Sequence, residues 1–317
     1  MEAEHDNLRA ALEWSVTRAP DICLRLVTAW EPFWGLRGYF AEGRQWQSRA
    51  LAASSTTTVD RARSLATASD LSFRQGDFLT SRALADESLM LAQQLGDLTT
   101  TARVLNRIGT TVAVLGDPVG ARSWYDRSIA LYQQLGDPHG ALVALCNIGK
   151  SAAYEGDFTA ALELFRRILP SIRQTGDLLR VASTLEGLGS LYLRESDFTG
   201  ARKCFSESLA IAREQENPVT IASALACLAH LAAATSQPER SIRLGGASQG
   251  FLNQAGVTNA SLADWWTADA DSAVEDMRAK VGRSAATAAW EDGRSMSRED
   301  VVAYALGEDF VSAGDLA

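Results

Sequence analysis

The dipeptide Gly-Asp recurs every 20 residues through the middle of this chain. Glycine is favoured just past the end of a helix, where the backbone dihedral φ becomes positive. Aspartate is favoured at the N-cap of the next helix, because its carboxylate accepts hydrogen bonds from free backbone N–H groups. Each dipeptide therefore predicts the end of one helix and the start of another. The dipeptides are Gly76-Asp77, Gly96-Asp97, Gly116-Asp117, Gly136-Asp137, Gly156-Asp157 and Gly176-Asp177, with weaker versions at Ser196-Asp197 and Glu216-Asn217.

A second period of 40 residues indicates that two helices form one unit. Apolar, small and aromatic residues each recur at this step, so successive units use the same packing positions. A repeated helix pair predicts an all-α helical-repeat solenoid, which binds partners along an extended surface. The recurring sets are Leu65, Leu105, Leu145, Leu185 and Leu225; Ile108, Ile148, Leu188 and Leu228; Gly109, Gly149 and Gly189; Ala121, Ala161 and Ala201; and Tyr125, Phe165 and Phe205.

Composition excludes several classes of function. The formal net charge of −9 and the sequence pI of about 5.0 disfavour direct nucleic-acid binding. No apolar run reaches the roughly 18 residues of a membrane span, and the acidic N-terminus lacks a signal-peptide core. The four cysteines form no CxxC pair, which predicts a reduced, cytoplasmic compartment.

The sequence predicts no catalytic residues, no cofactor and no metal site. The segment Gly149-Lys150-Ser151 resembles the end of a phosphate loop, but Ala144 stands where that motif needs glycine, and no strand precedes it. The histidines at positions 5, 139 and 230 are too far apart in the repeat to share a metal ion. We therefore expect a protein that is not an enzyme, with an enzyme on a helical-repeat scaffold as a third alternative.

The unit resembles the tetratricopeptide repeat. The apolar-Gly pair, the aromatic residue three positions later (Tyr192 in the fourth unit), the turn glycine, the alanine and the second-helix aromatic all have that family's spacing. The units are longer than the roughly 34 residues usual in the family. The match covers about residues 61–215 and weakens at both ends, as in capping repeats.

Two terminal regions resemble parts of LuxR-type and AfsR-type bacterial transcriptional regulators, which are signal-transduction ATPases with numerous domains. Residues 4–14 are similar to the junction that follows the nucleotide-binding and winged-helix portion, and residues 243–247 and 289–297 are similar to the closing segment. The resemblance implies a sensor region that receives an inducer or partner and controls the ATPase and DNA-binding parts. The alternative is a stand-alone tetratricopeptide adaptor that binds a peptide or protein.

Three parts are expected along the chain. Residues 1–18 form a leading helix that joins a missing upstream ATPase region, residues 19–257 form helical-pair repeats, and residues 258–317 form a C-terminal helical cap. The cap is predicted to hold helices over 262–280, 284–291 and 297–306, with Ser297 as an N-cap. The aromatic residues Trp30, Phe33 and Trp34 predict either a packed core or an aromatic ligand box, and their helical spacing favours the core.

The resemblance implies that ligand contacts the concave face, which the first helix of each pair lines. Residues on this face vary at the 40-residue step while the packing positions do not, as expected of a groove adapted to one ligand; a merely solvated face is the alternative. Arginine and lysine outnumber acidic residues there, which favours an anionic inducer or an acidic peptide. The candidate residues are Arg63, Asp70, Arg74, Arg103, Asn106, Thr110, Lys150, Tyr154, Glu186, Ser190, Arg194 and His230.

Overall fold

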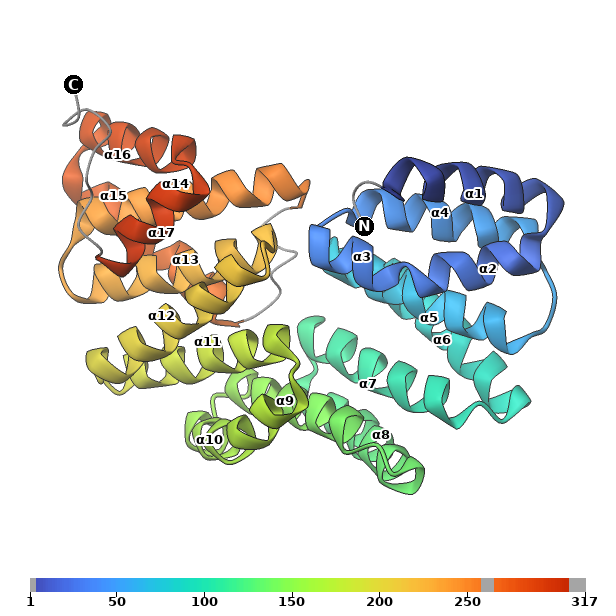
Figure 1. The fold of residues 1–317 in the computed structure, drawn as a ribbon. Coiled ribbons are helices and arrows are strands. Elements are labelled where there is room, and N and C mark those ends of the chain that lie inside the picture. Colours follow the sequence, from blue (N-terminus) through green and yellow to red (C-terminus); the bar gives the residue numbers. More distant parts are fainter. Residues whose placement is uncertain (1–3, 258–264, 308–317) are drawn as a thin grey trace. The chain divides into compact units, whose positions relative to one another are not determined.

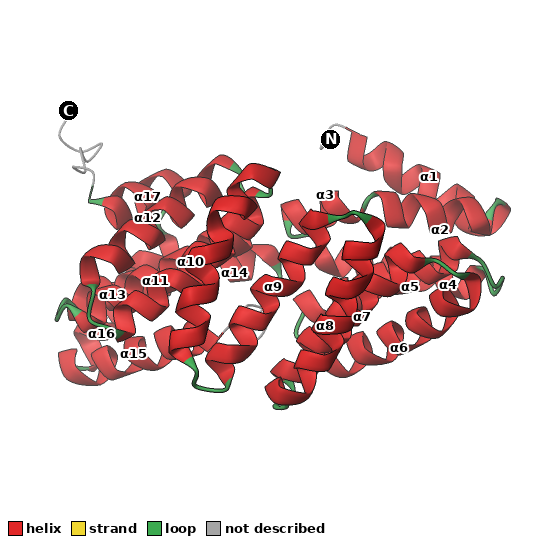
Figure 2. Cartoon of the chain, turned by 90° about the horizontal axis from the view of Figure 1, so that it is seen from below, coloured by secondary structure: helices red, strands yellow, loops and turns green. Residues whose placement is uncertain are grey.

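The computed structural model describes residues 4–257 and 265–307, and every regular element in these ranges is an α-helix. The chain divides into two compact units, Met1–Leu164 and Phe165–Ala317. The fold is an all-α solenoid of helix pairs, as the 20- and 40-residue periods predict (Figure 1). Short turns join most of the helices (Figure 2).

The first unit contains helices α1 to α9 and the start of α10. The first helices of three successive pairs, α5, α7 and α9, pack against one another in chain order, and α6 and α8 pack beside them. The bounds are α1 His5–Arg18, α2 Pro20–Ala29, α3 Glu31–Arg37, α4 Phe40–Ala53, α5 Val59–Arg74, α6 Phe78–Leu95, α7 Leu98–Val114, α8 Pro118–Leu135, α9 Pro138–Tyr154 and α10 Phe158–Thr175.

The second unit contains the rest of α10 and helices α11 to α17. The pairs α11–α12 and α13–α14 continue the repeat, and α15 and α16 pack closely on α13 and α14. The bounds are α11 Leu178–Arg194, α12 Phe198–Glu214, α13 Pro218–Ala234, α14 Pro238–Ala255, α15 Trp265–Val281, α16 Arg283–Ser295 and α17 Arg298–Leu306.

The Gly-Asp dipeptides do what the sequence predicts. The six repeat glycines have φ between 66° and 103°, and Asp97, for example, accepts a hydrogen bond from the backbone N–H of Thr100. The same turn persists without glycine at Ser196, Glu216 and Ser236, whose φ angles are 61°, 51° and 59°. The 20-residue spacing of the turns therefore continues one step beyond Glu216-Asn217, although the Gly-Asp dipeptide is missing there. Packing of the flanking helices imposes the turn.

Ser196→Gly is expected to stabilise the protein by about 0.5–1 kcal/mol, because a Cβ atom is unfavourable at positive φ. Ser196 is exposed, so the change removes little packing. The matched control is Ser123→Gly at an exposed position inside α8, which should destabilise by about 1 kcal/mol. Urea denaturation measures both, and a Ser196→Gly variant less stable than the parent would contradict the explanation.

The glycines of the 40-residue ladder allow two helices to approach closely. A Cβ atom at Gly109 would lie 2.7 Å from Cε1 of the Tyr125 ring, and one at Gly189 would lie 2.5 Å from Cε1 of Phe205. Tyr125 and Phe205 are fully buried. The predicted pairing of a small residue with an aromatic ring is therefore confirmed in these two helix pairs.

The ends of the repeat depart from the regular pattern. Trp34 is buried and packs over Gly43, and Phe33 is 3% exposed, so both belong to the core. At the other end, Ser297 accepts a hydrogen bond from the backbone N–H of Asp300 and caps α17 as predicted. Residues 262–264 of the predicted first cap helix lie outside the described residues, and α15 is described from Trp265. The division into parts 1–18, 19–257 and 258–317 stays a prediction.

Candidate functional site

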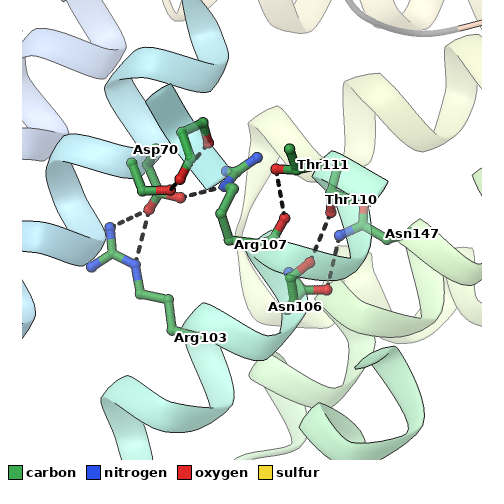
Figure 3. Close-up of polar contacts among 9 residues, drawn as sticks. Asp70, Arg103, Asn106, Arg107, Thr110, Thr111 and Asn147 are labelled. Carbon is green, nitrogen blue, oxygen red and sulfur yellow. Dashed lines mark hydrogen bonds and ion pairs between the residues drawn. The ribbon is translucent and has the colours of Figure 1, made fainter. Parts of the chain in front are cut away.

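Asp70 is the central residue of a polar surface on the first unit. This buried carboxylate lies near the end of α5 and joins two arginines of α7 (Figure 3). Its Oδ2 atom accepts hydrogen bonds from Nε of Arg103 at 3.0 Å and from Nη2 at 2.5 Å, and its Oδ1 atom accepts from Nε of Arg107 at 2.5 Å. The two arginines reach the same carboxylate because residues four apart share one face of a helix.

The two guanidinium groups keep Asp70 ionised. Burial alone would raise the pKa of Asp70, but the positive charges of Arg107 and Arg103, together with their hydrogen bonds, outweigh it and lower that pKa. The Asp70 carboxylate in turn raises the pKa of Arg103, against the opposing effect of burial, and the carboxylate of Glu31 on α3 contributes in the same direction. Asp70 and Arg103 are therefore both charged at neutral pH.

Amide groups continue this surface from α7 to α9. Asn147 donates a hydrogen bond from Nδ2 to Oδ1 of Asn106 at 3.0 Å, and the Thr110 hydroxyl donates to the carbonyl of Asn106 at 3.0 Å (Figure 3). We call the surface formed by Asp70, Arg103, Asn106, Arg107 and Asn147 the α5–α7–α9 face. It has both hydrogen-bond donors and acceptors, and contacts across three helices fix it.

Sequence reasoning missed two members of this face. Arg107 is absent from the predicted residues, although its position four residues after Arg103 on one helix is a signal that could have found it. Asn147 is also absent from the predicted residues; it is 7% exposed, and its amide bridges two first helices.

The other predicted residues of the first unit lie around this face. Arg63 is exposed, and its Nε atom is 3.2 Å from Oδ2 of Asp97, the N-cap of α7. Arg74 is exposed at the end of α5, and its guanidinium lies 5.8 Å from the ring centre of Phe40. Lys150 and Tyr154 are half-buried on α9.

In the second unit, two predicted residues are buried rather than open. Glu186 is 3% exposed and accepts hydrogen bonds from the hydroxyl groups of Ser208 at 2.8 Å and Ser223 at 2.6 Å, so it joins α11 to α12 and α13. Ser190, one turn later, is also 3% exposed. These side chains stabilise the packing of the unit.

Helix α15 contacts the corresponding first-helix surface of α11 and α13. Trp266 is fully buried, and its ring would contact a Cβ atom at Gly187 at 3.1 Å. An ion pair of 3.7 Å joins Arg194 to Asp269. The pKa of His230 is lowered, chiefly because the ring is partly removed from solvent. Arg194 and His230 therefore lie near each other, and α15 lies beside them.

The second unit also contains a cavity of about 280 Å³ between α13, α14, α15 and α16. Its lining includes two carboxylates, Asp271 and Glu275. The Arg278 guanidinium lies 4.8 Å from the ring centre of Trp290, and its Nη1 atom lies 2.8 Å from Oε1 of Glu275. The lining residues are Ala226, Gly245, Ser248, Gln249, Ala270, Asp271, Val274, Glu275, Arg278 and Trp290.

Among the described residues, no three His, Cys, Asp or Glu side chains gather as ligands for a metal ion. The four cysteines are buried, and none of them forms a disulfide. Within the same ranges, none of the helices combines the length and the hydropathy needed to span a bilayer.

Comparison with known proteins places these features in a family. The family model described as "MalT-like TPR region" matches residues 62–281. A Rap protein in complex with Competence and Sporulation Factor is similar in structure, with a TM-score of 0.57 and 12% identity over 81% of this chain and 75% of that chain. The apo form of RapI has a TM-score of 0.49 and 13% identity over 79% and 99% of the two chains. A comparison with curated proteins gives no match.

Proposed function

Because the chain belongs to the family of MalT-like tetratricopeptide regions, we propose that it is the sensor region of a signal-transduction ATPase-type transcriptional regulator. At the coarser level, it is a tetratricopeptide-repeat domain of the protein-interaction type. We propose that it catalyses no reaction and acts in the cytoplasm. Its role is to receive a protein or peptide partner, or a small-molecule inducer, and to pass that signal to the regulator.

The α5–α7–α9 face is the observation that carries this proposal. Its polar groups come from three successive first helices and are held by contacts between those helices, such as Asp70 to Arg103 and Asn147 to Asn106. A surface whose side chains are already ordered loses less conformational entropy when it binds a partner. In the second unit, the equivalent helices are covered by α15. We therefore propose that the partner binds the first unit.

The similar Rap protein supports a binding role for this kind of fold. It was solved in complex with Competence and Sporulation Factor. We propose that the present chain uses its own first-helix residues in a comparable way, with contact residues drawn from Arg63, Asp70, Arg74, Arg103, Asn106, Thr110, Lys150 and Tyr154.

A peptide selection tests the binding role. Random twelve-residue peptides displayed on phage are selected on the immobilised chain, and the enriched peptides are titrated against variants. Asn106→Ala should weaken binding about tenfold, or by about 1.4 kcal/mol, because it removes the side-chain amide from the face. Arg122→Ala, on the exposed side of α8, should bind as the parent does. Equal affinity for the parent and both variants would place the binding surface elsewhere.

The regulatory part of the proposal has a separate test. The coding sequence upstream of the Met1 codon should continue in frame into a region with a phosphate loop and a winged helix. A frame without these regions would support the stand-alone adaptor instead.

A further inference from the structure

We propose that Arg107, with Arg103 beside it, forms a subsite for a carboxylate or phosphate group of the ligand. This inference rests on the proposed function and names the chemistry that the α5–α7–α9 face recognises. It depends on how Asp70 and Phe73 hold the Arg107 side chain.

The Arg107 guanidinium is fixed on two sides. Its Nε atom donates to Oδ1 of Asp70 at 2.5 Å, and its Cζ atom lies 4.3 Å from the ring centre of Phe73. An arginine held in this way loses little further freedom when it binds. The side chain of Arg107 is 20% exposed, so the group is accessible although it is anchored.

The two terminal nitrogen atoms of the Arg107 guanidinium are available to bind a ligand. No hydrogen bond joins Nη1 or Nη2 of Arg107 to another residue within 4–257 or 265–307. Two parallel N–H groups at the end of a guanidinium match the two oxygens of a carboxylate or phosphate. Arg107 can therefore bind an oxyanion in bidentate geometry without releasing Asp70.

The charges around the site favour an anion. Asp70 neutralises one of the two arginines, and one positive charge is left on the pair. Glu31 is close enough to raise the pKa of Arg103, so it offsets charge on the Arg103 side of the cluster. Arg103 is 37% exposed in its side chain and lies at the edge of the site, where Asp70 and Glu31 offset its charge. We therefore assign the direct contact to Arg107, and Arg103 helps to hold Asp70, the carboxylate that positions Arg107.

The repeat itself does not need this charged cluster. One step of 40 residues after Arg103 and Arg107, the chain has Val143 and Asn147. Those positions pack in the same kind of first helix without any charge. Because the next helix pair stacks with neutral residues in these positions, the fold does not require the combination of Arg103 and Arg107.

The test uses the full chain with ¹⁵N-labelled arginine and two simple probes, potassium phosphate and sodium glutarate, at ionic strength held constant with potassium chloride. NMR of the guanidinium groups should show a saturable shift of the Arg107 signals with millimolar affinity for at least one probe. The stronger probe assigns the ligand group as phosphate or carboxylate. Arg107→Gln should weaken binding at least tenfold, as read from the Arg103 signals.

A matched control separates this site from general anion binding. Arg127 on α8 also lies over an aromatic ring, 5.0 Å from the centre of Trp124, but no carboxylate among the described residues pairs with it. Arg127→Gln should leave both titrations unchanged. The inference is wrong if neither probe saturates, or if Arg107→Gln binds like the parent. Peptides that depend on Asn106 but not on Arg107 would leave the proposed function standing and remove only the anion subsite.

Discussion

Gly293→Ala is expected to lower the free energy of unfolding of the second unit by about 3 kcal/mol, at the upper end of the usual cost of overpacking. A Cβ atom at Gly293 on α16 would lie 1.9 Å from the carbonyl oxygen of Arg243 on α14. The contact is reciprocal, because a Cβ atom at Gly246 would lie 2.2 Å from the carbonyl oxygen of Trp290. The clash involves backbone on both sides, so no rotamer change relieves it and the helices must separate.

The matched control is the same substitution at a glycine where an added Cβ atom fits without a clash. A Cβ atom at Gly35 in α3 would meet nothing closer than Oε1 of Glu31 at 3.8 Å. Gly35→Ala should therefore be neutral or stabilising by up to about 1 kcal/mol, since alanine is the better helix former. Urea denaturation followed by circular dichroism, with hydrogen exchange of α16, measures the effect. A Gly293→Ala variant with the parent midpoint and unchanged exchange in α16 would show that α14 and α16 are not in backbone contact.

Most of the helical framework could be predicted from the sequence because its signals are local. A glycine with positive φ and an aspartate that caps the next helix act within four residues, and the 40-residue step then identifies which positions face one another. The turn at Ser236 was not predictable in this way, since neither Ser236 nor Gln237 has a local preference for it. Packing of α13 against α14 imposes that turn.

The site was less predictable because it depends on contacts between helices. Periodicity places Asp70 and Arg103 on first helices, but it cannot show that one buried carboxylate binds two arginines. The 40-residue period also treats every helix pair as equivalent. The structure shows that Glu186 is buried by hydroxyl groups of two other helices and that α15 covers α11 and α13. Helix α15 lies after the periodic part of the sequence, so no step of 40 residues predicts that it covers these helices.

Asp70→Asn is expected to destabilise the first unit by about 1–3 kcal/mol at neutral pH. Removal of one partner from a buried ion pair usually costs about 3–5 kcal/mol, but here the arginines are partly exposed and water can solvate them. The exposed pair of Asp86 with Arg82 on α6 provides the control. Asp86→Asn should change stability by less than about 1 kcal/mol, because solvent screens such pairs.

The pH dependence of the Asp70→Asn effect identifies its electrostatic origin. The pKa of Asp70 is lower in the folded protein than the value of about 3.9 expected in the unfolded chain. The unfolded state therefore binds a proton more readily, and the stabilisation by ionised Asp70 is complete above about pH 4 and is lost as the pH falls toward the folded pKa. Urea midpoints of parent and variant should differ by a constant amount from pH 5 to 8 and converge in acid below about pH 4. A difference that persists unchanged in acid would mean that Asp70 acts through packing, and Arg103 and Arg107 would then need another source of order.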